Sequence, residues 1–240
     1  MTPAAAVDVL TRGRIEVHGR IAGSSNVTLL VTCSTGEEEG EGGGEELLAV
    51  YKPLAGEREL WDFPPGLHRR EVAAWLLSEW LGWGIVPETV LRTDAPFGEG
   101  SLQRVVDEDG VSHYFTLRDD PRWHPALRRI AAFDVLANNA DRKSGHVLRA
   151  GDRLWAIDHG LTFHAEPKLR TVIWDFAGDS LDEEVLCAVG KLAGTPLPAA
   201  LAELLGPGEA AALVRRARSL LAARSLPAPG PGRPYPWPLV

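Results

Sequence analysis

The chain has 240 residues and a mass of 26.0 kDa, with 45% hydrophobic and 24% charged residues. This length and composition suit one large domain or two packed lobes, and they exclude a disordered chain, a collagen-like fibre and a small disulfide scaffold. The net charge of −8 comes largely from six glutamates in residues 36–46, and the nearly neutral remainder lacks the basic stripe of a nucleic-acid-binding protein.

The cysteine content and the N-terminal residues favour a location in the cytoplasm. Cys33 and Cys187 are too few and too far apart for a disulfide framework, which favours a reducing environment. The first fourteen residues lack the basic and apolar regions of a signal peptide. No run approaches the roughly 18 apolar residues of a membrane span. We therefore expect a cytoplasmic protein with no membrane span and no nucleic-acid partner.

The N-terminal part is expected to be rich in strands. Alternating apolar residues predict a hairpin over 14–33, joined by a Gly/Ser/Asn connection, and a third strand at 47–51 that runs into Lys52. The Glu/Gly tract at 36–46 is a low-complexity insert between the second and third strands. A helix is predicted over 68–82 because apolar residues recur at helical spacing and Gly82 and Gly84 follow. Short strands are expected at 88–91 and 101–106.

The later part is expected to be helical. The predicted elements are a helix at 125–139, two short strands at 147–149 and 153–157, helices from about residue 180, and an extended Pro-rich tail at 227–240. This order predicts an α+β fold with two lobes. The expected parts are a sheet-rich N-lobe at 1–106, a helical C-lobe at 107–226 and the tail at 227–240.

Four features that carry chemistry occur in a fixed order. A Gly/Ser loop at 19–26 lies between two strands, and Lys52 ends the third strand before Glu71 in the next helix. Asp141 then follows a helix with His146 five residues later, and Asp158 ends a short strand. This is the order of parts in a protein-kinase-like site for phosphoryl transfer. Small residues let backbone N–H groups approach phosphates, a lysine held by a glutamate binds them, and aspartates orient the nucleophile and hold the metal.

The motifs resemble the phosphatidylinositol 3-/4-kinase-like superfamily, including its bacterial HipA-like members. The resemblance lies in NNADRKSGHVLR, with an N-x-D-R pattern at Asn139–Arg142, and in LWAIDHGLTFH, with an I-D-x-G-L-x-F pattern at Ile157–Phe163. It covers roughly residues 14–180. It implies a two-lobed kinase-like fold that binds ATP with Mg²⁺ or Mn²⁺.

The resemblance also implies a role for each matching residue. In the nucleotide site, Lys52 contacts the phosphates and Glu71 pairs with it, with Glu79 as the competing partner. In the C-lobe, Asp141 of the Asn139 motif is the catalytic aspartate and Asp158 is the principal metal ligand. The phosphate loop contains Ser24, Ser25 and Asn26, and a hinge at 103–106 that includes Gln103 and Val105 offers backbone groups to adenine.

Two positions depart from the superfamily pattern. His146 stands where an asparagine is usual, and Lys143 stands where a histidine often follows D-R. Because Mg²⁺ prefers oxygen ligands, His146 as a metal ligand indicates either a preference for Mn²⁺ or a related ion, or weakened catalysis. Lys143 is a cation that can stabilise the γ-phosphate in place of the missing histidine.

The expected function is therefore a kinase that phosphorylates a hydroxyl group. A protein side chain or a small metabolite is favoured over a lipid as the acceptor, since no basic or amphipathic membrane surface stands out. Two alternatives remain open: a nucleotide-binding pseudokinase with a regulatory role, and an enzyme that transfers AMP on the same fold.

Overall fold

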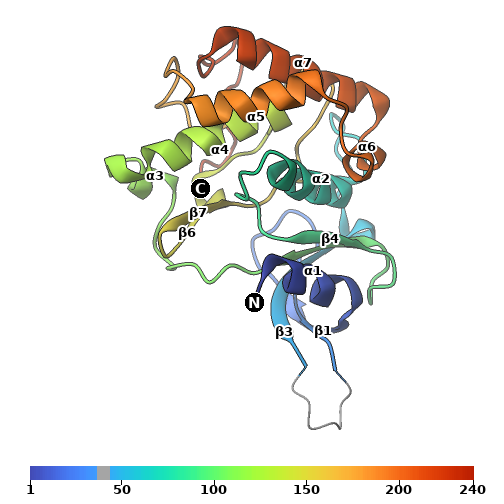
Figure 1. The fold of residues 1–240 in the computed structure, drawn as a ribbon. Helices are drawn as coiled ribbons and strands as arrows, with labels where there is room; N and C mark the ends of the chain where they lie inside the picture. The colour runs from blue at the N-terminus through green and yellow to red at the C-terminus, as the bar shows by residue number, and fades with distance from the viewer. Residues whose placement is uncertain (37–43) are drawn as a thin grey trace.

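The computed structural model describes residues 1–36 and 44–240. The N-terminal half contains a five-stranded antiparallel sheet with strand order β1-β2-β3-β5-β4 (Figure 1). Its strands are β1 (Arg14–Arg20), β2 (Leu29–Ser34), β3 (Glu46–Pro53), β4 (Thr89–Arg92) and β5 (Gly100–Arg104). The predicted hairpin is confirmed, with Ile15 opposite Cys33 and Val17 opposite Val31. Residues 37–43 of the predicted acidic insert lie outside the described residues.

Helix α1 (Pro3–Arg12) packs against this sheet and was not predicted. It begins at Thr2, whose hydroxyl accepts a hydrogen bond from the Ala5 N–H, with proline at the first helical position. Val9 and Leu10 are buried with apolar residues of β2, β3 and β5. Arg92 of β4 donates to the carbonyl oxygens of Leu10 and Gly13 and so fixes the end of the helix against the sheet.

Helix α2 (Leu67–Trp80) lies between the sheet and the helical half (Figure 1). It agrees with the prediction at 68–82 to within two residues at either end. Buried residues occur on most sides of this helix, because it contacts β4 and β5 on one side and α6 on another. A short helical turn, η1 (Leu54–Gly56), precedes it. This central place lets one helix carry residues toward both halves of the molecule.

The C-terminal half is built mainly of helices. Its helices are α3 (Tyr114–Leu117), α4 (His124–Ala137), α5 (Glu183–Gly194), α6 (Ala199–Leu204) and α7 (Pro207–Ala223), with short turns η2 (Pro121–Trp123) and η3 (Ser144–His146). A two-stranded ribbon, β6 (Val147–Ala150) and β7 (Arg153–Ala156), confirms the two predicted short strands. The α+β expectation is thus confirmed, with a sheet in one half and helices in the other.

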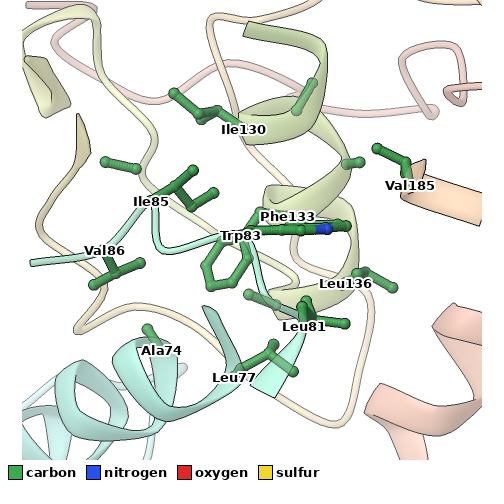
Figure 2. Close-up of a cluster of buried hydrophobic side chains, with 14 of the residues drawn as sticks. Ala74, Leu77, Leu81, Trp83, Ile85, Val86, Ile130, Phe133, Leu136 and Val185 are labelled. Carbon is green, nitrogen blue, oxygen red and sulfur yellow. The ribbon is translucent and has the colours of Figure 1, made fainter. Parts of the chain in front are cut away.

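The larger hydrophobic core lies where α2 and the chain that follows it meet α4 and α5. Trp83 packs edge-on against Phe133 of α4 at 6.3 Å between ring centroids. Figure 2 shows Leu77, Leu81 and Ile85 around this contact, together with Ile130 and Leu136 of α4. Trp83 is therefore a core residue, and the partly buried Trp75 and Trp80 of α2 pack against the same core. This packing holds α2 in a fixed position relative to α4.

None of the helices in the described residues combines the length and the apolar character needed to cross a membrane.

Candidate active site

A cavity of about 690 Å³ lies between the sheet and the helical half. This volume is in the range of small-molecule sites in proteins. Predicted site residues from distant parts of the chain line it, namely Ser24, Ser25, Asn26, Lys52, Glu71, Gln103, Asp141, Lys143, His146 and Asp158. Of the predicted set, only Asn139 and Val105 do not line it.

Lys52 on β3 sits between two carboxylates. Its Nζ is hydrogen-bonded to Oε1 of Glu71 on α2 and lies 2.8 Å from Oδ1 of Asp158. Burial by itself would lower the pKa of Lys52, but the carboxylates of Asp158 and Glu71 outweigh burial and raise it. Glu79, the competing candidate, lies near Arg153 and Glu88 instead. The lysine is therefore charged and held at the cavity wall.

Asp158 follows β7 and projects from an unusual backbone conformation. Its φ of 59° lies in the left-handed region, which few residues other than glycine adopt, although aspartate is among the more tolerant. The Glu71 side chain also accepts a hydrogen bond from the His159 N–H at 2.9 Å, so one glutamate fixes both Lys52 and the Asp158 loop. The Lys52 cation keeps the pKa of Asp158 well below its usual range, and Asp158 is therefore ionised.

The predicted catalytic loop, residues 139–146, begins directly after α4. Asn138 ends that helix in the left-handed conformation, and the side-chain oxygen of Asn139 then accepts a hydrogen bond from the Asp141 N–H at 2.9 Å. Asn139 is fully buried and donates to Asp134, so it holds Asp141 from behind rather than facing the cavity. Burial raises the pKa of Asp141 to about 6, against the opposing effect of Lys143, whose Nζ lies 3.4 Å away.

His146 and Asp158 are the two cavity residues placed to hold a metal. Nε2 of His146 lies 3.3 Å from Oδ2 of Asp158, and burial lowers the pKa of His146 to about 4, so its imidazole is neutral. No cluster of three or more His, Cys, Asp or Glu side chains suited to a metal occurs in residues 1–36 and 44–240. One carboxylate and one imidazole fit a divalent ion whose remaining ligands come from phosphates and water.

The residues of the predicted phosphate loop line the cavity, whereas only part of the predicted hinge does. Gly23 has a φ of 82°, and the loop closes through a hydrogen bond from Ile21 N–H to the Thr28 carbonyl oxygen at 2.8 Å. Asn26 accepts a hydrogen bond from the Arg58 N–H at 2.9 Å. In the hinge, Gln103 lines the cavity, but the Val105 N–H donates to the Leu48 carbonyl oxygen and is engaged in the sheet.

Arg142 is a central residue to which the sequence assigned no role. It is fully buried and forms a bidentate ion pair with Asp134 of α4 at 2.9–3.1 Å. It also donates to the Ile157 carbonyl oxygen at 2.7 Å and contacts Nε2 of His159 at 2.7 Å. Arg142 thus ties the catalytic loop to both sides of Asp158. Its place in the N-x-D-R motif was the available signal, but sequence does not reveal burial of a charge.

A comparison with known proteins places the chain in a family. It is 42% identical to Protein Rv2133c of Mycobacterium tuberculosis, over 96% of this chain and 94% of that protein. The chain belongs to the family of Protein Rv2133c. No protein-family model matches it.

This chain also resembles known kinases in sequence and in fold. It is 26% identical to phosphatidylinositol 4-kinase gamma 4 of Oryza sativa over 79% of its length, and it spans 42% of that protein. The crystal structure of the Golgi casein kinase with Mn/ADP bound superposes with a TM-score of 0.61 at 16% identity, over 92% of this chain and 75% of that one. The fold is therefore the two-lobed protein-kinase-like fold, as the sequence predicted.

Proposed function

We propose that this protein is a kinase that transfers the γ-phosphoryl group of ATP to a hydroxyl group, with a divalent metal ion. The observation that carries the proposal is the position of Lys52, held between Glu71 and Asp158 at one wall of a cavity that Asp141 faces. The three charges come from β3, α2 and the segment after β7, so the fold assembles them from distant parts of the chain. We assign the N-lobe to residues 1–106, the C-lobe to 107–226 and the tail to 227–240.

The predicted site residues that line the cavity have distinct roles in this reaction. Lys52 binds the α- and β-phosphates, and the small residues of the 21–28 loop admit backbone contacts to phosphate oxygens. Asp158 and His146 hold the divalent ion, which when bound supplies positive charge beside the phosphate oxygens. The Mn and ADP bound in the Golgi casein kinase structure support binding of a nucleotide and a divalent metal by this fold. Mn²⁺ and Mg²⁺ are both candidates, and His146 favours Mn²⁺.

Asp141 and Lys143 act on the transferred group. The acceptor oxygen forms a bond to the γ-phosphorus, the bond between that phosphorus and the bridging oxygen breaks, and ADP leaves. Asp141 accepts the hydroxyl proton, which its carboxylate at the cavity surface is placed to do. Lys143, 3.4 Å from Asp141, offsets negative charge on the γ-phosphate. The acceptor is a hydroxyl of a protein or a small molecule, and the free thiols of Cys33 and Cys187 suit a cytoplasmic setting.

One observation favours a second candidate function, a pseudokinase that binds nucleotide without transferring phosphate. His146 replaces an oxygen ligand with an imidazole, which weakens a magnesium site. Such a protein would bind ATP in the same cavity and act through a partner.

The test is turnover of ATP by the full chain with Mg²⁺ and with Mn²⁺, with the products identified by mass. We expect ADP, and a phosphorylated product when the acceptor is present. The Asp158→Ala variant should lose turnover, whereas Asp152→Ala, which changes an exposed aspartate in the β6–β7 turn, should retain it. Nucleotide binding without turnover would favour the pseudokinase, AMP attached to the product would favour AMP transfer, and no nucleotide binding would refute all three.

A further inference from the structure

The Pro-rich tail returns to the catalytic loop and forms hydrogen bonds around it. The carbonyl oxygen of Leu239 accepts a hydrogen bond from the Ser144 N–H at 2.9 Å. The carbonyl oxygen of Pro234 accepts two, from the Thr171 N–H at 3.0 Å and from Nε1 of Trp174 at 3.1 Å. Pro236 is buried and Leu239 packs against the larger core. These contacts dock residues 234–239 on the body of the protein, although they form neither helix nor strand.

Ser144 lies at the turn of the catalytic loop, on the side away from the cavity. Its neighbours Lys143, Gly145 and His146 line the cavity, whereas Ser144 does not and is fully buried. The hydrogen bond to Leu239 therefore reaches the loop from behind the two side chains that face the nucleotide site. The turn itself, η3, has only three residues, and so it has few internal hydrogen bonds with which to fix its own position.

A second connection runs through Thr171. The backbone of Arg142 pairs with the residues on both sides of Thr171, since its N–H donates to Arg170 and its carbonyl oxygen accepts from Val172. The Thr171 N–H points the other way and donates to Pro234. The segment at 170–172 is thus hydrogen-bonded to the tail through Thr171 and to the catalytic loop through Arg170 and Val172. The tail supports the loop both directly at Ser144 and through this intervening segment.

We propose that residues 234–239 position the catalytic loop, so that Lys143 and His146 are held at the cavity by the tail. This inference rests on the proposed kinase function. Lys52, Glu71 and the 21–28 loop come from the other half of the molecule and have no contact with the tail among the hydrogen bonds and ion pairs of the described residues. Loosening the tail should therefore reduce the transfer step more than nucleotide binding, which retains Lys52, Asp158 and the 21–28 loop.

The test uses Leu239→Asp in the full chain, which places a charge in the apolar contact of the tail. The matched control is Val240→Asp, which places the same charge at the adjacent residue, where 73% of the surface is exposed. We expect faster hydrogen exchange of the amides at 143–146 in Leu239→Asp, because the Ser144 N–H loses its partner. The kcat should fall by about ten- to a hundredfold, the cost of displacing a catalytic group by roughly 1 Å. The KM for ATP should change by less than the kcat does, because Lys52 and Asp158 stay in place.

Unchanged exchange at 143–146 together with unchanged kcat would overturn the proposal. A rise in KM for ATP equal to the loss in kcat would also overturn it, since that would indicate general loosening of the protein. If Leu239→Asp does not fold, Trp174→Phe removes one donor to Pro234 while retaining an aromatic ring, and the same readouts apply. If the wild-type protein binds nucleotide but has no turnover, the kinase proposal fails, and hydrogen exchange alone still decides whether the tail holds the loop.

Discussion

Asp141 links the geometry of the cavity to a measurable pH dependence. Burial raises its pKa to about 6, and the nearby Lys143 cation opposes that rise without cancelling it. A carboxylate accepts a proton only when it is ionised, so kcat/KM should fall as the pH is lowered through about 6, by about tenfold for each further unit. Measurement of kcat/KM between pH 5 and 8 tests this. A profile that is flat down to pH 5 would remove Asp141 from the role of base.

Arg142 and Asp134 form an ion pair that is wholly buried. The loss of either residue therefore leaves the charge of the other without a counter-ion in the core. Replacing Arg142 with methionine leaves the Asp134 carboxylate unpaired in the core, which should lower the free energy of unfolding by about 3–5 kcal/mol. Replacing both residues, as Arg142→Met with Asp134→Leu, should recover part of that loss. Chemical denaturation of the single and double variants measures both values.

The matched control is Arg128→Met, which breaks a partly exposed pair with Asp179. Pairs of that kind contribute about 0–1 kcal/mol, so this variant should unfold almost as the wild type does. Equal losses for Arg128→Met and Arg142→Met would contradict the account of Arg142.

The start of α2 depends on ionisable groups. The helix begins after Gly66, which has no side chain to cap it, and Glu57 instead accepts hydrogen bonds from the N–H groups of Gly66 and His68 at 2.8 Å. The His68 ring lies between Glu57 and Glu99, at 2.7 and 3.0 Å. A carboxylate at a helix N-terminus is favourable because the N–H groups there have no partner within the helix.

This arrangement predicts how stability changes with pH. Burial alone would lower the pKa of His68, but its bonds to Glu57 and Glu99 outweigh burial and raise it. Because the folded pKa exceeds the unfolded value of about 6.5, the contribution of His68 is complete below about pH 6.5 and is lost as the pH rises through the folded pKa.

Urea denaturation of the wild type and of His68→Gln between pH 5 and 9 measures this contribution. The difference in unfolding free energy should be largest at pH 5 and shrink at alkaline pH. A difference between wild type and His68→Gln that grows with pH would contradict the ion-pair account.

The strands and long helices followed from the sequence because their apolar residues repeat at the spacing of the element. Helix α1 did not, since its first turn is alanine-rich and only Val9, Leu10 and Ala6 are buried. The cap at Thr2 stabilises the start of the helix. The side chain of Arg92, 82 residues beyond Leu10 in the chain, fixes the end of the helix to the sheet. Such long-range contacts leave no local periodic pattern.

For the whole molecule, the candidate site could be predicted because its charged residues fall in a recognisable order. The structure brings Lys52, Glu71 and Asp158 together as that order requires. The support behind them could not be predicted. The sequence around Arg142 does not show that this charge is buried. The docking of the tail depends on backbone hydrogen bonds between segments far apart in sequence, such as that from Ser144 to Leu239, which leave no local pattern.

The most direct test of the central claim is nucleotide binding, measured as the thermal shift of the full chain with ATP and Mg²⁺ or Mn²⁺. A ligand at 100 times its dissociation constant adds about 2.7 kcal/mol to the free energy of unfolding. The account predicts a metal-dependent rise in Tm that is lost in Asp158→Ala and kept in Asp152→Ala. No shift of the wild type with any nucleotide and either metal would contradict it.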